Sequence, residues 1–169
     1  MNLLLDTEVL QDYTTEPVSV ATAKAYMKVN FTDDDSLIES LIKNARIWLE
    51  NYTGKAYGTR SIKLTIEMTA GEWYELPGPV QSVDSLVSYD YADCSQYDIA
   101  GSQIRVYATG IYMVYLTYGF TTIPEDAKND ILSITAYTYQ NRGIDLSNEG
   151  ANLVDFPMLA TQYQRRVPI

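Results

Sequence analysis

Residues 35–54 read DSLIESLIKNARIWLENYTG, and residues 62–68 read IKLTIEM. In the first stretch the apolar side chains recur every three or four residues, which is typical of one face of an amphipathic helix. In the second stretch apolar and polar residues alternate, which predicts a strand with one buried face. Because the spacing of the apolar residues changes from three or four to two between these stretches, we expect the chain to combine helices with a β-sheet.

The long helix has a predicted start, end and core face. The acidic run Asp33-Asp34-Asp35 favours an N-cap and places negative charge at the positive end of the helix dipole, and Gly54 favours a left-handed end. A metal or general-acid site is the alternative interpretation of this run. The pair Arg46/Glu50 is expected on the solvent side. The core stripe is predicted to contain Leu37, Leu41, Ala45, Trp48 and Tyr52, widened by Ile38, Ile42 and Leu49.

Two further helices are predicted, one on each side of the strand region. The first lies within residues 17–30 with Ser19 as its N-cap, and the other spans 124–142, opened by Pro124 and two acidic residues. Together with the long helix they are expected to form a small bundle. Its core is predicted to join the long helix to the last one through Leu41, Ala45, Leu49, Ile131 and Ile134.

Glycines and prolines divide the region between the helices into short strands. The strands are expected over 62–68, 72–76, 83–91, 96–99, 103–107 and 111–118. The last one is apolar on both faces, which predicts a central position in an antiparallel sheet. The fold class is therefore α+β: a small helical bundle with an inserted antiparallel β-sheet or sandwich.

These elements divide the chain into four parts. We expect an N-terminal arm over 1–16, a helical core over 17–57 and 123–143, an inserted antiparallel β region over 58–122, and a C-terminal extended arm over 144–169. The boundaries follow the changes of period and the turn residues.

Composition excludes most catalytic chemistry. The 169 residues include no histidine and one cysteine, Cys94, so histidine-based catalysis, imidazole-bound zinc, an internal disulfide and a cysteine metal cluster are all excluded. The glycines are scattered singly at turns, so the sequence has no phosphate-binding loop. We therefore expect no enzyme activity, no cofactor and no bound metal.

Charge and hydropathy restrict the partners. The net charge is −10, and no basic stripe is present that would neutralise phosphates, so tight nucleic-acid binding is disfavoured. The longest near-apolar stretch, Ile111 to Leu116, is too short to cross a membrane. The first residues lack a basic flank, which argues against a secretory signal. We expect a protein that is made in the cytoplasm and does not enter a membrane.

Fifteen tyrosines are the one unusual feature of the composition. Tyrosine is favoured in half-buried strands and at subunit interfaces, and it also stacks on sugar rings. A carbohydrate-binding module that uses strand aromatics therefore stays open as an alternative to a structural protein, although the long helices count against it.

A separate alternative is an acid–base hydrolase built on paired carboxylates. The sequence offers no positioned pair of carboxylates for it.

Three groups of motifs follow one another in a specific order. The first runs from Glu16-Pro17-Val18-Ser19 to Thr53-Gly54-Lys55-Ala56, the second is Leu76-Pro77-Gly78-Pro79-Val80, and the third joins Tyr118-Gly119 to Pro124-Glu125-Asp126-Ala127. Over about residues 16–143 this arrangement resembles the head–tail connector (adaptor) proteins of long-tailed bacteriophages and related gene-transfer particles. Within that family it is similar to the longer branch, which carries a β-sheet insertion.

The resemblance implies a structural protein of the virion, located at the head–tail junction. It implies a homo-oligomeric ring, typically of 12 copies, that sits beneath the portal protein and receives a stopper, tail-completion or tail protein below. Double-stranded DNA is expected to pass through the ring without specific binding, and the acidic balance of the chain agrees with such a passage.

The C-terminal segment has no helical period, yet it is too apolar for a freely solvated tail. We expect residues 145–169 to form an extended arm that docks on the portal, as the resemblance also implies. The alternative is a tail that folds back over its own sheet. The candidate portal-docking residues are Phe156, Met158, Leu159, Tyr163, Arg165 and Arg166.

Overall fold

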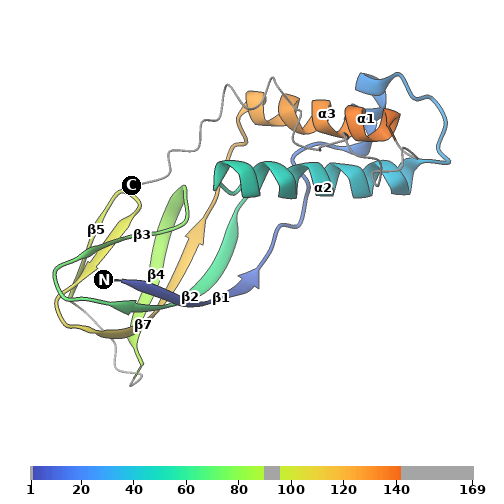
Figure 1. Ribbon diagram of the computed structural model, residues 1–169. Helices are drawn as coiled ribbons and strands as arrows, with labels where there is room; N and C mark the ends of the chain where they lie inside the picture. The colour runs from blue at the N-terminus through green and yellow to red at the C-terminus, as the bar shows by residue number, and fades with distance from the viewer. Residues whose placement is uncertain (1, 90–95, 142–169) are drawn as a thin grey trace, which may run out of the picture. The chain divides into compact units, whose positions relative to one another are not determined.

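The computed structural model describes residues 2–89 and 96–141, which form two compact units (Figure 1). The helical unit contains Glu16–Thr53 and the described residues from Ile123 onward. The β unit contains the described residues up to Thr15 together with Gly54–Thr122. The α+β class is confirmed. Residues 54–57, which were expected in the helical core, group with the β unit.

Three helices make up the helical unit: α1 (Val20–Met27), α2 (Asp35–Thr53) and α3 (Glu125–Gln140). Helix α2 packs against both α1 and α3, which also contact each other. The predicted N-cap of α1 is present, since Ser19 Oγ accepts a hydrogen bond from Thr22 N at 3.1 Å. The three helices therefore begin and end close to the predicted positions.

The buried face of α2 is shifted by one position from the centre of the predicted stripe. Leu37 is 38% exposed and Leu41 is half-buried, whereas Ile38 and Ile42 are buried. The prediction that Leu41 is a buried core residue is therefore wrong. The stripe through Leu37 and Leu41 and the stripe through Ile38 and Ile42 are both apolar. Packing against α1 and α3 buries the stripe through Ile38 and Ile42. The other four proposed core residues, Ala45, Leu49, Ile131 and Ile134, are buried.

A charged network lies inside the helical unit. The Arg46 side chain is 3% exposed, and its Nε and Nη2 donate to the two carboxylate oxygens of Glu16 at 2.6 and 3.1 Å. Its Nη1 donates to Glu50 Oε2 at 2.9 Å. The expected position of Arg46 and Glu50 on the solvent side is therefore wrong. Because Glu16 precedes α1, the network fixes the point where the chain enters this unit.

The strands of the β unit form two antiparallel sheets (Figure 1). The larger sheet has the order β1-β2-β7-β4, and the smaller sheet has the order β3-β6-β5. The central position predicted for the strand near 111–118 is confirmed, because β7 pairs with both β2 and β4. The strands are β1 (Leu3–Gln11), β2 (Arg60–Met68), β3 (Trp73–Glu75), β4 (Val80–Ser88), β5 (Tyr97–Ala100), β6 (Gln103–Val106) and β7 (Gly110–Tyr118).

The two sheets share one apolar core, as in a small sandwich. Alternate residues of β2 and β7 point inward, and β6 supplies Ile104 and Val106 from the smaller sheet. The inward-facing residues of the larger sheet include Ile62, Leu64, Ile66, Met68, Tyr112, Val114 and Leu116, all of them buried.

The N-terminal segment is not an independent arm over 1–16. Its residues from Leu3 to Gln11 form β1, which pairs with β2 from Leu3↔Glu67 to Gln11↔Ser61. The sequence of this segment alternates only over residues 5–9, where Asp6 and Glu8 separate Leu5, Thr7 and Val9. An edge strand that is exposed on both faces does not need a longer alternation, because backbone pairing with β2 holds it in place.

The turns at one end of the β unit are closely interlocked. Ala56 N donates to Gly78 O at 3.2 Å, and Phe120 N donates to Ala56 O at 3.1 Å. Gly119 has a φ of 106°, and a Cβ atom at this position would lie 1.7 Å from the carbonyl oxygen of Gly58. Three motifs that are distant in the sequence thus meet at this end, and the close approach requires glycine at position 119.

We expect Ile131→Ala to destabilise the helical unit by about 2–5 kcal/mol, because this side chain is fully buried. Leu41→Ala should cost less, below about 2 kcal/mol, since a half-buried side chain loses less apolar contact. Urea denaturation followed by the helical circular-dichroism signal measures both free energies of unfolding. Equal costs would contradict the observed face of α2.

We expect Gly119→Ala to lower the melting temperature of the β unit strongly, because the new Cβ atom collides with the backbone at Gly58. Gly71→Ala is the matched control. Gly71 also has a positive φ, 80°, but a Cβ atom there meets no described atom within 4 Å. The control should therefore show only the backbone cost of about 1–2 kcal/mol. Thermal melting of both variants measures the difference. Equal melting temperatures would refute the close approach of Gly119 to the Gly58 carbonyl oxygen.

Candidate interaction surface

Strand β1 lies at one edge of the larger sheet (Figure 1), and all nine of its residues are exposed. One edge of the strand pairs with β2, and the other edge has no strand partner among the described residues. Five apolar side chains of β1 are 45–54% exposed, namely Leu3, Leu4, Leu5, Val9 and Leu10. An apolar strand with a free edge is a surface that proteins usually cover.

The pairing register shows which way these side chains face. Leu4 is opposite Ile66 and Val9 is opposite Ile62, and both partners are buried in the core of the sandwich. Leu4 and Val9 therefore lie on the core side of the larger sheet. They stay half-exposed, so the smaller sheet leaves the core side of β1 uncovered.

A groove of about 390 Å³ lies beneath this part of the sheet. The Asn2 side chain bridges β1 to the neighbouring elements, because its Nδ2 donates to Trp73 O at 3.1 Å and its Oδ1 accepts from Thr69 N at 2.8 Å. Burial raises the pKa of the Tyr74 phenol, which therefore stays neutral. The groove is lined by Leu4, Thr7, Ile62, Leu64, Tyr74, Glu75, Leu76, Pro77 and Tyr118.

The outer face of the smaller sheet carries a second group of exposed side chains. The Arg105 guanidinium lies over the Trp73 ring, 4.7 Å from its centroid, and forms an ion pair with Asp98. The Tyr107 hydroxyl donates to Asp98 Oδ2 at 2.6 Å. Tryptophan, tyrosine and arginine are the residues that most often dominate protein interfaces. The guanidinium also occupies a ring face that a sugar would need, which weakens the carbohydrate-binding alternative.

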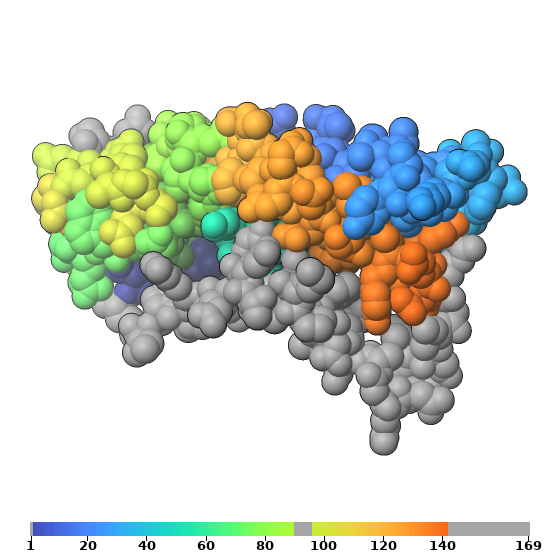
Figure 2. Space-filling model, turned by 90° about the horizontal axis from the view of Figure 1, so that it is seen from above, coloured from blue at the N-terminus to red at the C-terminus, as the bar shows by residue number. Residues whose placement is uncertain are grey.

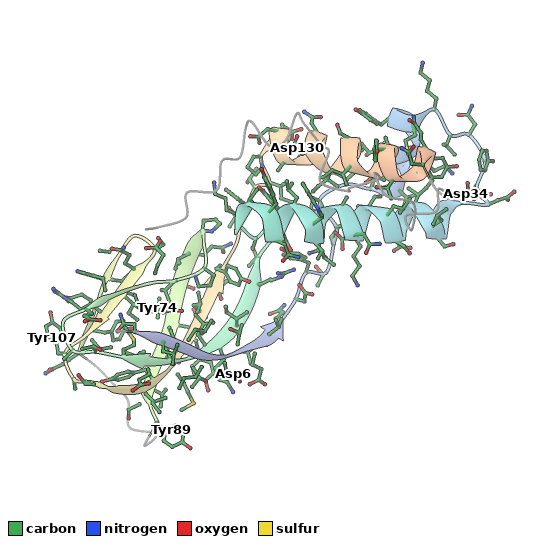
Figure 3. All side chains as sticks on the ribbon, viewed as in Figure 1. Asp6, Asp34, Tyr74, Tyr89, Tyr107 and Asp130 are labelled. Carbon is green, nitrogen blue, oxygen red and sulfur yellow. The ribbon has the colours of Figure 1, made fainter. Side chains whose placement is uncertain are left out.

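Figure 3 labels Asp6 of β1 together with Tyr74 and Tyr107 in the β unit, and Asp34 in the helical unit. Asp34 accepts a hydrogen bond from the Tyr139 hydroxyl at 2.6 Å, and Asp35 forms an ion pair with Lys24 at 2.6 Å. The acidic run therefore supports the helix bundle. Among the described residues, no group of three His, Cys, Asp or Glu residues could hold a metal ion.

The candidate residues of the sequence analysis fall into two groups. Of the five predicted core positions, four are buried in the helical unit and Leu41 is half-buried. The six candidate portal-docking residues, from Phe156 to Arg166, lie outside the described residues. None of the described helices is long and apolar enough to span a membrane.

Sequence reasoning missed the surface formed by β1 and the groove. The run Leu3-Leu4-Leu5, followed by β-favouring residues at 7 and 9, was the available signal. The alternation of these residues with Asp6 and Glu8 is only five residues long, so it did not distinguish a strand from an irregular arm. The space-filling view in Figure 2 shows one face of the chain, coloured by residue number.

We expect Tyr107→Phe to raise the pKa of Asp98. The hydrogen bond from the Tyr107 hydroxyl is the main cause that lowers this pKa, and the Arg105 ion pair adds to it. A depressed pKa means that the contribution of Asp98 to stability is present above the unfolded pKa of about 4 and is lost as the pH falls through the folded value. Carboxyl NMR titration of the two proteins measures the change. An unchanged titration would show that the hydroxyl does not hold Asp98.

Solved structures with the same fold come from gene transfer agent (GTA) particles. A chain of the virion of a native GTA particle is 19% identical, with a TM-score of 0.70 and coverage of 95% of each chain. A chain of the neck of an empty GTA particle, computed with C6 symmetry, is 18% identical. It has a TM-score of 0.66 and coverage of 87% of this chain and 90% of that one.

A third match is a chain from the neck of a native GTA particle, computed with C12 symmetry. It is 19% identical, with a TM-score of 0.59 and coverage of 88% of this chain and 89% of that one. No curated protein sequence matches significantly.

The sequence also matches a family model, described as the phage gp6-like head–tail connector protein. The match covers residues 17–102, which is 86 of the 169 residues. It includes α1, α2 and the strands of the β unit from β2 to β5. With this match and the shared fold, the chain belongs to the phage gp6-like head–tail connector family.

Proposed function

We propose that the protein forms a homo-oligomeric ring, of 12 copies, at the junction between the capsid and the tail of a phage-like particle. The observation that carries this proposal is the match of residues 17–102 to the connector family. The fold supports it, since similar chains occur in GTA necks that were computed with C6 and C12 symmetry. In a ring of this kind each subunit presents two different surfaces to its neighbours.

The ring is proposed to join two partners. Above it lies the portal protein, and below it a stopper, tail-completion or tail protein. The proposed portal contact is the C-terminal segment, whose sequence combines apolar residues such as Phe156 and Leu159 with the basic pair Arg165-Arg166. Apolar anchors with a charged end suit an extended segment that adds to another protein.

The ring is also proposed to surround the passage of double-stranded DNA without binding it tightly. Three basic residues of the β unit, Arg60, Lys63 and Arg105, are in ion pairs with acidic residues of the same unit. Their charge is neutralised within the protein. With a net charge of −10, the subunit repels phosphates rather than attracting them.

We expect deletion of residues 150–169 to leave a folded subunit that no longer binds the portal. The arm is proposed to act outside its own domain, so the melting temperature should not change. Retention on purified portal rings, followed by electron microscopy, measures the binding, and Arg165→Ala/Arg166→Ala is a milder variant with an expected partial loss. Retained portal binding would refute the arm. Loss of folding would instead favour a tail that covers its own sheet.

We expect micromolar protein to leave duplex DNA unretarded in a gel at physiological salt. The reason is the absence of a basic stripe in the sequence together with the net negative charge. The same gel at about 50 mM salt is a stringent control, because weak phosphate contacts strengthen as salt falls. Micromolar binding with a steep salt dependence would contradict the passive passage.

A further inference from the structure

The edge strands of the larger sheet, β1 and β4, have no further strand partner among the described residues, and they fit each other in direction and length. Neighbouring strands are antiparallel throughout the order β1-β2-β7-β4. With four alternating strands, the two edge strands β1 and β4 run in opposite directions. Each of them has nine residues. The β4 edge of one copy can therefore continue the antiparallel pattern when it lies beside the β1 edge of another copy.

The strand register places the ends of the two edges at matching levels. On the β1 side, Gln11 is opposite Ser61 of β2, and Ser61 is opposite Thr117 of β7. Thr117 is in turn opposite Ser82 of β4. These four residues lie side by side across the sheet, with Gln11 and Ser82 at its two edges, and both edge residues are exposed. Adding a second copy without stagger brings its Ser82 next to Gln11 of the first.

At each lateral edge of the sandwich, apolar side chains on the core-facing side of a strand are left half-exposed. On the β1 side these are Leu4 and Val9, above the groove. The smaller sheet has β3 near β1, because Asn2 is bonded to Trp73, and β5 at its opposite edge. There Ile99 is 46% exposed, although it is opposite the buried Ile104. A contact that joins the two sides covers apolar surface on both subunits.

We propose that β1 of one subunit pairs with β4 of the next, so that the four-stranded sheets join around the ring. The occupant of the β1 edge is a second copy of this chain, because the same chain offers the complementary edge on its other side. A contact of this kind is head-to-tail, as a ring requires, whereas pairing of β1 with β1 gives a closed two-fold dimer. Strand addition supplies backbone hydrogen bonds, and the groove accepts side chains of the neighbour.

This inference rests on the proposed ring, and cross-linking tests it separately. The full chain carries Gln11→Cys and Ser82→Cys in a Cys94→Ser background, and a short flexible bismaleimide is added after assembly on purified portal rings. The double variant should give a ladder of covalent multimers, whereas each single variant should stay monomeric. Dimers from Gln11→Cys alone would overturn the inference in favour of two-fold pairing. Rings that are visible by electron microscopy but give no ladder would overturn the inference and leave the proposed function standing, whereas absence of rings would refute both.

Charge on the β1 face is a second test that does not need cross-links. Leu4→Asp/Val9→Asp changes two half-exposed residues, so we expect only a modest fall in the melting temperature of the isolated subunit. At a temperature where circular dichroism shows the variant folded, the amount of ring on the portal should fall at least tenfold. Leu37→Asp, at a 38% exposed position of α2, is the matched control and should assemble normally. Ring assembly by the double variant at the level of the unchanged protein, or equal loss in the control, would contradict the proposed contact.

Discussion

One buried guanidinium connects the start of the helical unit to the middle of α2. Arg46 holds Glu16, which precedes α1, and Glu50, which lies one turn further along α2. Removing the arginine would leave Glu50 buried without this partner, and breaking a buried pair in this way typically costs about 3–5 kcal/mol. The chain leaves β1 before Glu16 and returns to the β unit after α2. The Arg46–Glu16 pair thus holds the segment that leads from the β unit into the helical unit against α2.

The β unit follows from a different constraint, the unequal size of its two sheets. Four strands face three, so the larger sheet extends beyond the smaller one at β1. Its core-facing residues at that edge, Leu4 and Val9, are left without cover. In an isolated subunit these apolar side chains stay in contact with water, whereas in a ring a neighbouring subunit can bury them. The groove therefore agrees with the proposed contact between neighbouring subunits.

Periodicity and cap residues predicted most of the fold. Ser19 and Gly54 marked helix ends correctly, the alternation at 62–68 gave β2, and the apolar run at 111–118 gave the central strand. Leu41 was misassigned because two adjacent stripes of α2 are apolar, and only tertiary packing chooses between them. Strand β1 was missed because its alternation covers only residues 5–9 and because an exposed edge strand does not need a longer one. The family match confirms the expectation of a structural connector rather than an enzyme.

Cryo-electron microscopy of the neck of purified particles tests whether this chain forms a ring at the head–tail junction. We expect a closed ring between portal and tail whose density fits both the helical unit and the β unit of this chain. A neck that lacks the chain, or density for it elsewhere in the particle, would refute the proposed ring.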